Sequence, residues 1–161
     1  MDIRTDIWRF APATWVRDYK SHNHYLVKGT EYQQIEYDVQ RAVKNLKKVL
    51  AIWRVQNIFH YGQFLMRSQI LAREDSVASY YKVRRYVAIP TSLVETAMEY
   101  NLDHRRLNME NIEFCSHLPY VEDDHSIFVV CILTKDVEAR CISPYDFTEY
   151  YIDYVVDIDI F

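Results

Sequence analysis

The stretch from residue 49 to residue 64 limits the possible folds more than any other part of the chain. Residues 49–55 (VLAIWRV) are apolar apart from Arg54 and partly β-branched, which is typical of a strand buried on both faces of a sheet. Gln56 and Asn57 follow as a polar corner, and the Asn57 side chain can accept an amide of a following helix as its N-cap. From Ile58, apolar residues recur at helical spacing. This pattern predicts a core unit of strand, corner and helix.

Periodicity elsewhere in the chain predicts an α+β domain. The expected elements are helices at 31–43 and 93–100 and strands at 81–89, 127–133, 137–142 and 155–161. Thr30 is expected to cap the first helix, and Thr91 or Ser92 the second, because hydroxyl side chains can accept the first free amides. We expect the strand at 137–142 to pair with the strand at 127–133 as a hairpin.

Three segments lack a regular apolar period. Residues 1–30 are rich in turn-forming and aromatic residues, so we expect a short-stranded lead-in whose aromatic rings pack on the core. Residues 74–79 and 103–120 are polar or mixed and are predicted to be loops. No repeat or linker interrupts the chain, and its 161 residues fit a single domain over 1–161.

Composition excludes several classes of function. A net charge of −4 gives no bulk attraction to nucleic acid or to an anionic membrane, and no apolar run is long enough to span a membrane. Only Gly29 and Gly62 are present, whereas backbone cradles for phosphate need glycines close together. The odd number of cysteines favours a reduced protein in the cytoplasm or nucleus, with Cys131 and Cys141 as small core residues.

Residues 52–64, IWRVQNIFHYGQF, carry a family resemblance. They are similar to the pattern I-x-R-V-Q-N-x-x-L-W/Y-x-x-Y/F of PARP-type ADP-ribosyltransferase catalytic domains, in particular the mono-ADP-ribosylating, zinc-finger-associated branch. Further landmarks follow in order at residues 12–15, 31–35, 87–107 and 128–135. The resemblance implies a fold of central antiparallel-rich sheets with flanking helices. Since family domains continue beyond the segment similar to 156–161, it also implies that the C-terminal strand is either truncated here or replaced.

At the catalytic positions of the family this chain differs. The resemblance places Ile89, Glu113 and Ile160 at the three positions of the degenerate triad. Ile89 and Pro90 stand where active relatives have a histidine and a glycine that hold the nicotinamide ribose and amide. Isoleucine cannot form these hydrogen bonds, and proline has no N–H to donate. Glu113 also places a carboxylate near the expected path of the pyrophosphate.

Only a vestige of the NAD pocket is expected, formed by Pro90, Thr91 and Tyr120. Without its donors, the pocket loses both NAD binding and the positioning that transfer requires. We therefore expect no cofactor and no catalysis, and a PARP-like pseudoenzyme that acts as a protein–protein interaction module or scaffold of a larger intracellular protein. The 14 tyrosines are compatible with such an interface, because their rings give contact area at low entropic cost.

Other functions stay open at this stage. One is residual mono-ADP-ribosyltransferase activity, and another is binding of ADP-ribose or NAD without turnover. A third is RNA binding through basic stretches that include Arg84 and Arg85. We favour a protein partner over nucleic acid and expect no membrane association.

Two further sets of polar residues have a structural interpretation. Arg54 and Gln56 are expected to hold the strand-to-helix corner by pairing with backbone carbonyls. Zinc donors are present at His22, His24, Cys115 and His117, but they lack the tight pair spacing of structural zinc sites, so no metal site is expected.

Overall fold

The computed structural model describes residues 7–74 and 80–161. Its strands are β1 (His22–Leu26), β2 (Leu46–Asn57), β3 (Tyr81–Pro90), β4 (Phe114–Cys115), β5 (His125–Thr134), β6 (Cys141–Ile142) and β7 (Tyr150–Ile160). Its helices are α2 (Gly29–Ala42), α3 (Ile58–Glu74) and α4 (Val94–Glu99), with short 3₁₀ turns at Thr91–Leu93 and Phe147–Glu149.

The strands form one seven-stranded sheet in the order β1-β2-β7-β5-β3-β4-β6. Every neighbouring pair is antiparallel. The expected combination of an antiparallel sheet with flanking helices is confirmed as a mixed α/β fold built on a single sheet.

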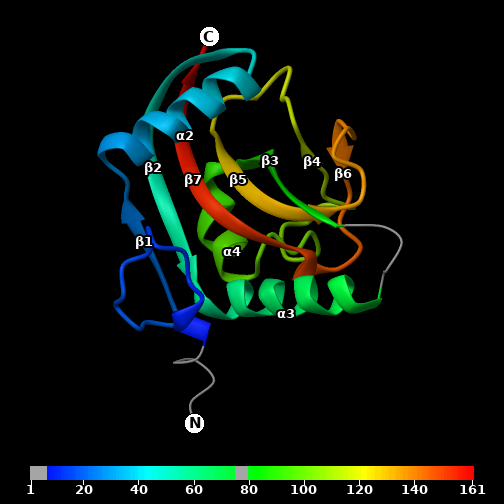
Figure 1. Cartoon of the computed structure of the whole chain (residues 1–161). Coiled ribbons are helices and arrows are strands. Elements are labelled where there is room, and N and C mark those ends of the chain that lie inside the picture. Colours follow the sequence, from blue (N-terminus) through cyan, green and yellow to red (C-terminus); the bar gives the residue numbers. More distant parts are fainter. Residues whose placement is uncertain (1–6, 75–79) are drawn as a thin grey trace.

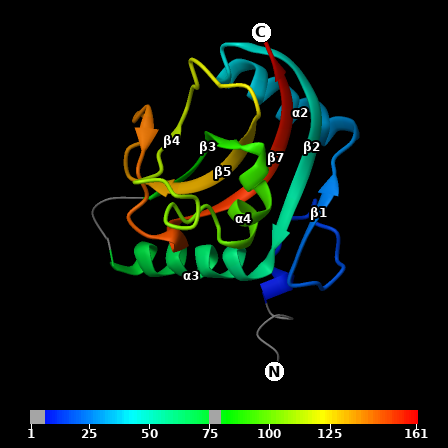
Figure 2. The ribbon, with the colours of Figure 1, turned by 180° about the vertical axis from the view of Figure 1, so that it is seen from behind.

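Helices cover both faces of the sheet. On one face, here called the α2–α3 face, α2 and α3 pack on opposite ends of the long strands (Figure 1). The other face, here called the α4 face, is covered by α4 and the loop that follows it (Figure 2). Each face buries its own core cluster because successive side chains of a strand point to opposite sides: Ile89 belongs to the cluster on the α4 face and Tyr86 to that on the α2–α3 face.

The predicted strand, corner and helix at residues 49–64 are confirmed as β2 and α3. Asn57 caps α3 as expected, since its Oδ1 accepts the amides of Phe59 and His60 at 3.1 Å each. The strand is less buried than its sequence suggested. Leu50 is 56% exposed, whereas Ile52 and Val55 are buried.

Several local predictions were wrong. Residues 141–142 pair with β4, so the predicted hairpin with β5 does not form. Thr30 lies inside α2, which begins at Gly29 (φ +66°) without a side-chain cap. Thr91 and Ser92 form a 3₁₀ turn before α4, and the residue before α4 likewise makes no side-chain cap. The local preference for hydroxyl caps was therefore overridden at both helices.

The N-terminal lead-in packs its aromatic rings on the core as predicted. Trp8 and Trp15 are buried and form a cluster with Ile58 and Tyr61 of α3. The strand expected in this segment is β1. Glu74 ends α3, and the remainder of the loop predicted at 74–79 lies outside the described residues. The loop predicted at 103–120 is confirmed except for the two-residue strand β4.

Candidate functional site

Arg54 and Gln56 are structural, but Arg54 does not use the predicted partners. The Gln56 side chain accepts from Val16 N at 2.7 Å and donates to Val16 O at 2.8 Å, which ties the lead-in to the corner. Arg54 instead donates to the Glu31 carboxylate, which also accepts the Tyr154 hydroxyl at 2.7 Å. Burial alone would raise the pKa of Glu31, but these hydrogen bonds outweigh burial and lower its pKa.

The three positions that the family resemblance assigns to a triad lie apart. Ile89 is fully buried in the core of the α4 face, and Ile160 packs at the edge of the core on the α2–α3 face. Glu113 is exposed, just before β4. The structure does not bring these side chains into one site.

The vestigial pocket residues are also separated. Pro90 ends β3, and Thr91 follows it, with its hydroxyl 3.0 Å from that of Ser126. Tyr120 is 70% exposed and lines none of the cavities described below. Of the predicted pocket residues, Thr91 alone lines one of these cavities.

Two adjoining cavities lie on the α4 face between β1 and α4, with volumes of about 290 and 250 Å³. His24, Glu95 and Met98 line both, so we treat the two as one feature, the β1–α4 groove. Strands β1, β2 and β7 form its floor and α4 forms a wall. The residues that reach only one of the cavities include His22, Asn57, Glu99, Trp53, Thr91 and Asp157.

The β1–α4 groove is acidic. Glu95 and Glu99 are exposed, stand one helical turn apart on α4, and have no ion-pair partner within residues 7–74 and 80–161. Asp157 adds a third carboxylate and accepts from Trp53 Nε1 at 3.1 Å. The Trp53 ring meets His24 edge-on, with 5.4 Å between centroids. The groove thus combines carboxylates with an aromatic wall.

One end of the groove lies near a neutral imidazole. Burial, with a smaller contribution from the neighbouring His22, lowers the pKa of His60 to about 4. Because His60 is uncharged at neutral pH, it does not offset the carboxylates of the groove.

The outer edge of β1 is open. Val27 N donates to Ile52 O at 2.9 Å, and Ile58 N donates to Ser21 O at 3.1 Å. In an antiparallel pair these bonds alternate, so the backbone groups of His22, His24 and Leu26 point away from β2. Within the described part of the chain no strand pairs with that side of β1. The His24 amide donates to Asn23 Oδ1 at 2.8 Å, which protects one position of the edge.

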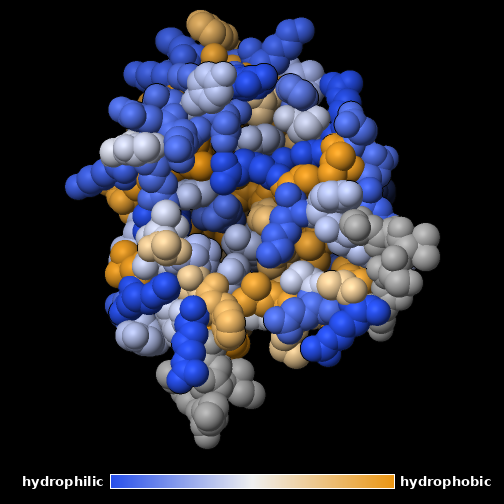
Figure 3. All heavy atoms as spheres, in the orientation of Figure 1, coloured by the Kyte–Doolittle hydropathy of each residue, from blue (hydrophilic) through white to orange (hydrophobic). Residues whose placement is uncertain are grey.

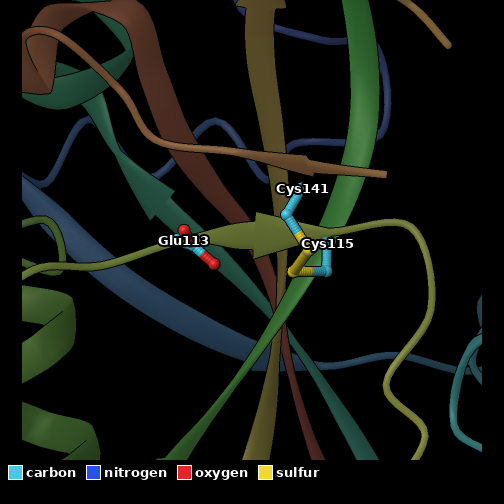
Figure 4. Close-up of side chains that lie close together, drawn as sticks. All are labelled: Glu113, Cys115 and Cys141. Carbon is cyan, nitrogen blue, oxygen red and sulfur yellow. A yellow bond between two sulfur atoms is a disulfide. The ribbon is translucent and has the colours of Figure 1, made fainter. Parts of the chain in front are cut away.

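A second cluster lies at the far end of the sheet. Cys115 of β4 and Cys141 of β6 form a disulfide, and the carboxylate of Glu113 lies beside it (Figure 4). The prediction that Cys141 is a small core residue was wrong, since it is exposed and bonded to Cys115. The two sequence positions are 26 residues apart, and nothing in the sequence indicated that pairing.

Arg84 and Arg85, two of the basic residues considered for RNA binding, are engaged within the chain. Arg84 pairs with Asp38 at 2.7 Å and with Asp153 at 3.5 Å. Arg85 is 9% exposed and donates to the carbonyl oxygens of Val137 and Ala139 at 2.9 and 3.3 Å. Their guanidinium groups are therefore committed to internal partners.

No family model matches the chain, and no curated protein matches it significantly. The resemblance to PARP-type ADP-ribosyltransferases therefore stays a prediction. Among the helices of residues 7–74 and 80–161, none has the length and apolar character needed to cross a bilayer.

Sequence reasoning missed the groove. Glu95 and Glu99 stand four residues apart in a predicted helix, a spacing from which a shared acidic face could have been inferred, but no signal in the sequence gives the segment that this face opposes. His22 and His24 alternate on a strand and were considered only as zinc donors. Within the described residues, the sets of donors close enough to hold a metal do not include them.

Proposed function

We propose that this chain is a non-catalytic protein-interaction module that binds an extended, basic peptide segment in the β1–α4 groove. The observation that carries the proposal is the position of unpaired carboxylates beside an open strand edge. An added strand gains affinity from backbone hydrogen bonds, and pockets beside it select alternate side chains.

The geometry allows both contributions at once. The backbone N–H and C=O groups of His22 and Leu26 both point away from β2 and are available to an added strand. The side chains of His22 and His24 line the groove. A peptide paired with β1 would direct alternate side chains toward α4. Lysine or arginine at those positions would approach Glu95 and Glu99.

The carboxylates decide which peptide is favoured. Glu95, Glu99 and Asp157 line the groove, and His60 nearby is neutral. Cationic side chains are attracted to such a surface, and acidic peptides are repelled. The Trp53 ring and the Met98 thioether supply apolar contact for the aliphatic stems of lysine and arginine.

The same charges argue against residual NAD chemistry in this groove. A pyrophosphate would meet carboxylates where it requires cations or clustered amides. Ile89 is sealed in the core, and Pro90 lacks an amide hydrogen, so neither replaces the donors of an active transferase. We therefore keep the pseudoenzyme interpretation and favour it over turnover or NAD binding.

RNA binding is disfavoured for a different reason. Arg84 and Arg85 have internal partners, so contact with phosphate would require breaking ion pairs or buried hydrogen bonds. The predicted cytoplasmic or nuclear location remains part of the proposal, and there the Cys115–Cys141 pair would be held as thiols.

The test is an NMR titration of the ¹⁵N-labelled chain with a short peptide of alternating lysine and threonine. We expect amide shifts confined to β1 and α4. The double substitution Glu95→Gln and Glu99→Gln should weaken binding about five- to tenfold, since each exposed ion pair is worth up to about 1 kcal/mol.

Matched controls separate the groove from general charge attraction. Glu122→Gln removes an exposed carboxylate outside the groove and should leave the affinity unchanged. A peptide whose backbone amides are N-methylated cannot donate to the edge in either strand direction and should bind more weakly. Equal binding of a glutamate–threonine peptide, or shifts spread away from β1 and α4, would refute the proposal.

A further inference from the structure

The cluster at Glu113, Cys115 and Cys141 has the donors of a metal site. The two sulfur atoms and a carboxylate oxygen all lie within 4.8 Å of one another. Glu113 directly precedes β4, and its carboxylate lies beside Cys115, which is paired in register with Cys141 of β6 (Figure 4). We infer that these residues bind Zn²⁺ when the disulfide is reduced, and that the disulfide and the metal exclude each other.

The donor set suits zinc. Thiolate and carboxylate are both established zinc ligands, and a tetrahedral centre with Zn–S bonds of about 2.3 Å places its ligand atoms slightly less than 4 Å apart. The three donor atoms lie within 4.8 Å of one another, and once the disulfide is broken the two sulfur atoms can move apart to the zinc-ligand separation by side-chain rotation. Three protein donors leave a fourth position for water. Hard cations such as Mg²⁺ prefer oxygen ligands and are not expected here.

Conversion of the disulfide form into the zinc-bound form needs two electrons, which a dithiol reductant supplies. A dithiol reductant exchanges with the Cys115–Cys141 disulfide, closes its own disulfide, and transfers two electrons and two protons, which leaves two thiols. Zn²⁺ then forms one bond to each sulfur, and both thiol protons pass to solvent. The Glu113 carboxylate supplies the third bond.

The backbone keeps the two cysteines opposed after reduction. Cys115 and Cys141 are paired in register between β4 and β6, and Ser116 N donates to Arg140 O at 2.8 Å. Phe114, between Glu113 and Cys115, is fully buried and anchors β4 in the core. Glu113 and Cys141 are exposed, so a reductant and a metal ion can both reach the site.

This inference does not depend on the proposed peptide function. Strands β4 and β6 form one end of the sheet, and β1 forms the other. Metal binding is measured without peptide, so either proposal can fail while the other stands.

The experiment uses Co²⁺ as a spectroscopic probe for the zinc site. The chain is reduced with dithiothreitol, freed of reductant without oxygen, and titrated with Co²⁺, then with Zn²⁺. We expect thiolate-to-cobalt charge-transfer absorption that saturates at one ion per chain and is displaced by Zn²⁺. The oxidised chain should show none. Absence of this absorption in the reduced chain, or its presence in the oxidised chain, would overturn the inference.

Substitutions assign the ligands. Cys141→Ser should abolish the absorption, and Glu113→Gln should weaken Co²⁺ binding at least about tenfold, because even loss of an outer-shell partner typically costs that much. Cys131→Ser and Glu110→Gln remove a thiol and an exposed carboxylate outside the cluster and should bind like the parent. Because Glu113 is on the surface, Glu113→Gln should leave the fold intact, which circular dichroism can check. Unchanged affinity in Glu113→Gln, or absorption that survives Cys141→Ser, would overturn the three-donor site.

Discussion

Two groups of charged residues, one on each face of the sheet, differ in how they are used. On the α2–α3 face two strand arginines are paired: Arg54 with Glu31, and Arg84 with Asp38 and Asp153. On the α4 face, Glu95 and Glu99 stand exposed beside a groove without a described ion-pair partner. The charges of the first group are neutralised by partners within the chain, and those of the second group are available to a ligand. Residues of the same type thus have different roles on the two faces.

Hydrophilic residues cover most of the upper part of the α2–α3 face, and apolar residues appear at its centre and lower part (Figure 3). The paired arginines of this face already have internal partners, whereas Glu95 and Glu99 have no ion-pair partner within the described residues. The comparison therefore directs the search for a partner to the α4 face and predicts that substitutions on the α2–α3 face act mainly on stability.

The largest loss in the free energy of unfolding is expected from Arg54→Ala. Arg54 is 9% exposed, and its removal leaves the largely buried Glu31 carboxylate, whose side chain is 17% exposed, with only the Tyr154 hydroxyl as a close partner among the described residues. Breaking a buried ion pair in this way typically costs about 3–5 kcal/mol. Urea unfolding followed by circular dichroism measures the loss in the free energy of unfolding.

Two further variants test whether an unpaired charge causes that loss. The double substitution Arg54→Met and Glu31→Gln removes both charges and should recover a large part of the stability. Lys47→Ala breaks an exposed pair with Asp159 at 3.9 Å and should cost less than about 1 kcal/mol. If Arg54→Ala were as mild as Lys47→Ala, the distinction between paired and free charges would not hold.

The next effect depends on pH and concerns Asp153. Burial raises the pKa of Asp153 to about 6, and the attraction of Arg84 only partly counters it. The folded chain thus holds this proton to higher pH than the unfolded chain, where the pKa is near 3.8. This group's contribution to stability is present below that unfolded pKa and lost as pH rises to about 6. Asp153→Asn cannot titrate and should therefore not show this decrease in the free energy of unfolding, which is on the order of 3 kcal/mol in the parent.

The measurement is the free energy of unfolding between pH 4 and pH 7, compared at each pH with that of the parent. Asp153→Asn should gain stability relative to the parent as pH increases, and then level off above about pH 6. Asp159→Asn on the same strand is the control for loss of a carboxylate, since its side chain is 42% exposed. A difference for Asp153→Asn that stays flat, or that falls with pH, would contradict the raised pKa.

The local elements of this fold could be predicted from the sequence, but the pairings between distant segments could not. Asn57 was found as a cap because the cap, the strand before it and the helix after it are contiguous. The pairing of β6 with β4 was missed because two-residue strands carry no detectable period. The Cys115–Cys141 bond was missed because an odd number of cysteines fixes no connectivity.

Candidate sites were harder to predict than elements, for a related reason. Ile152 and Tyr154 of β7 oppose the consecutive residues Val130 and Val129, so Asp153 is the extra residue of a β-bulge. A bulge breaks the alternation by which a sequence assigns residues to faces, so the sequence did not show that Asp153 lies beside Arg84. Glu95 and Glu99 were visible as a helical pair, but their importance depends on β1, about 70 residues earlier in the chain.

The smallest effect is expected for the groove itself. Glu95 lies in the first turn of α4 and Glu99 in its last, where the helix dipole favours and disfavours a negative charge, respectively. The double substitution Glu95→Gln and Glu99→Gln should therefore change the free energy of unfolding by no more than about 0.5 kcal/mol, because the two dipole effects cancel and both side chains are exposed. Urea unfolding of this variant and of Arg54→Ala gives the change in the free energy of unfolding on each face, and the two changes can be compared directly. A loss above about 1 kcal/mol would show that these carboxylates support the fold, and the weaker peptide binding of the variant would then have a structural cause.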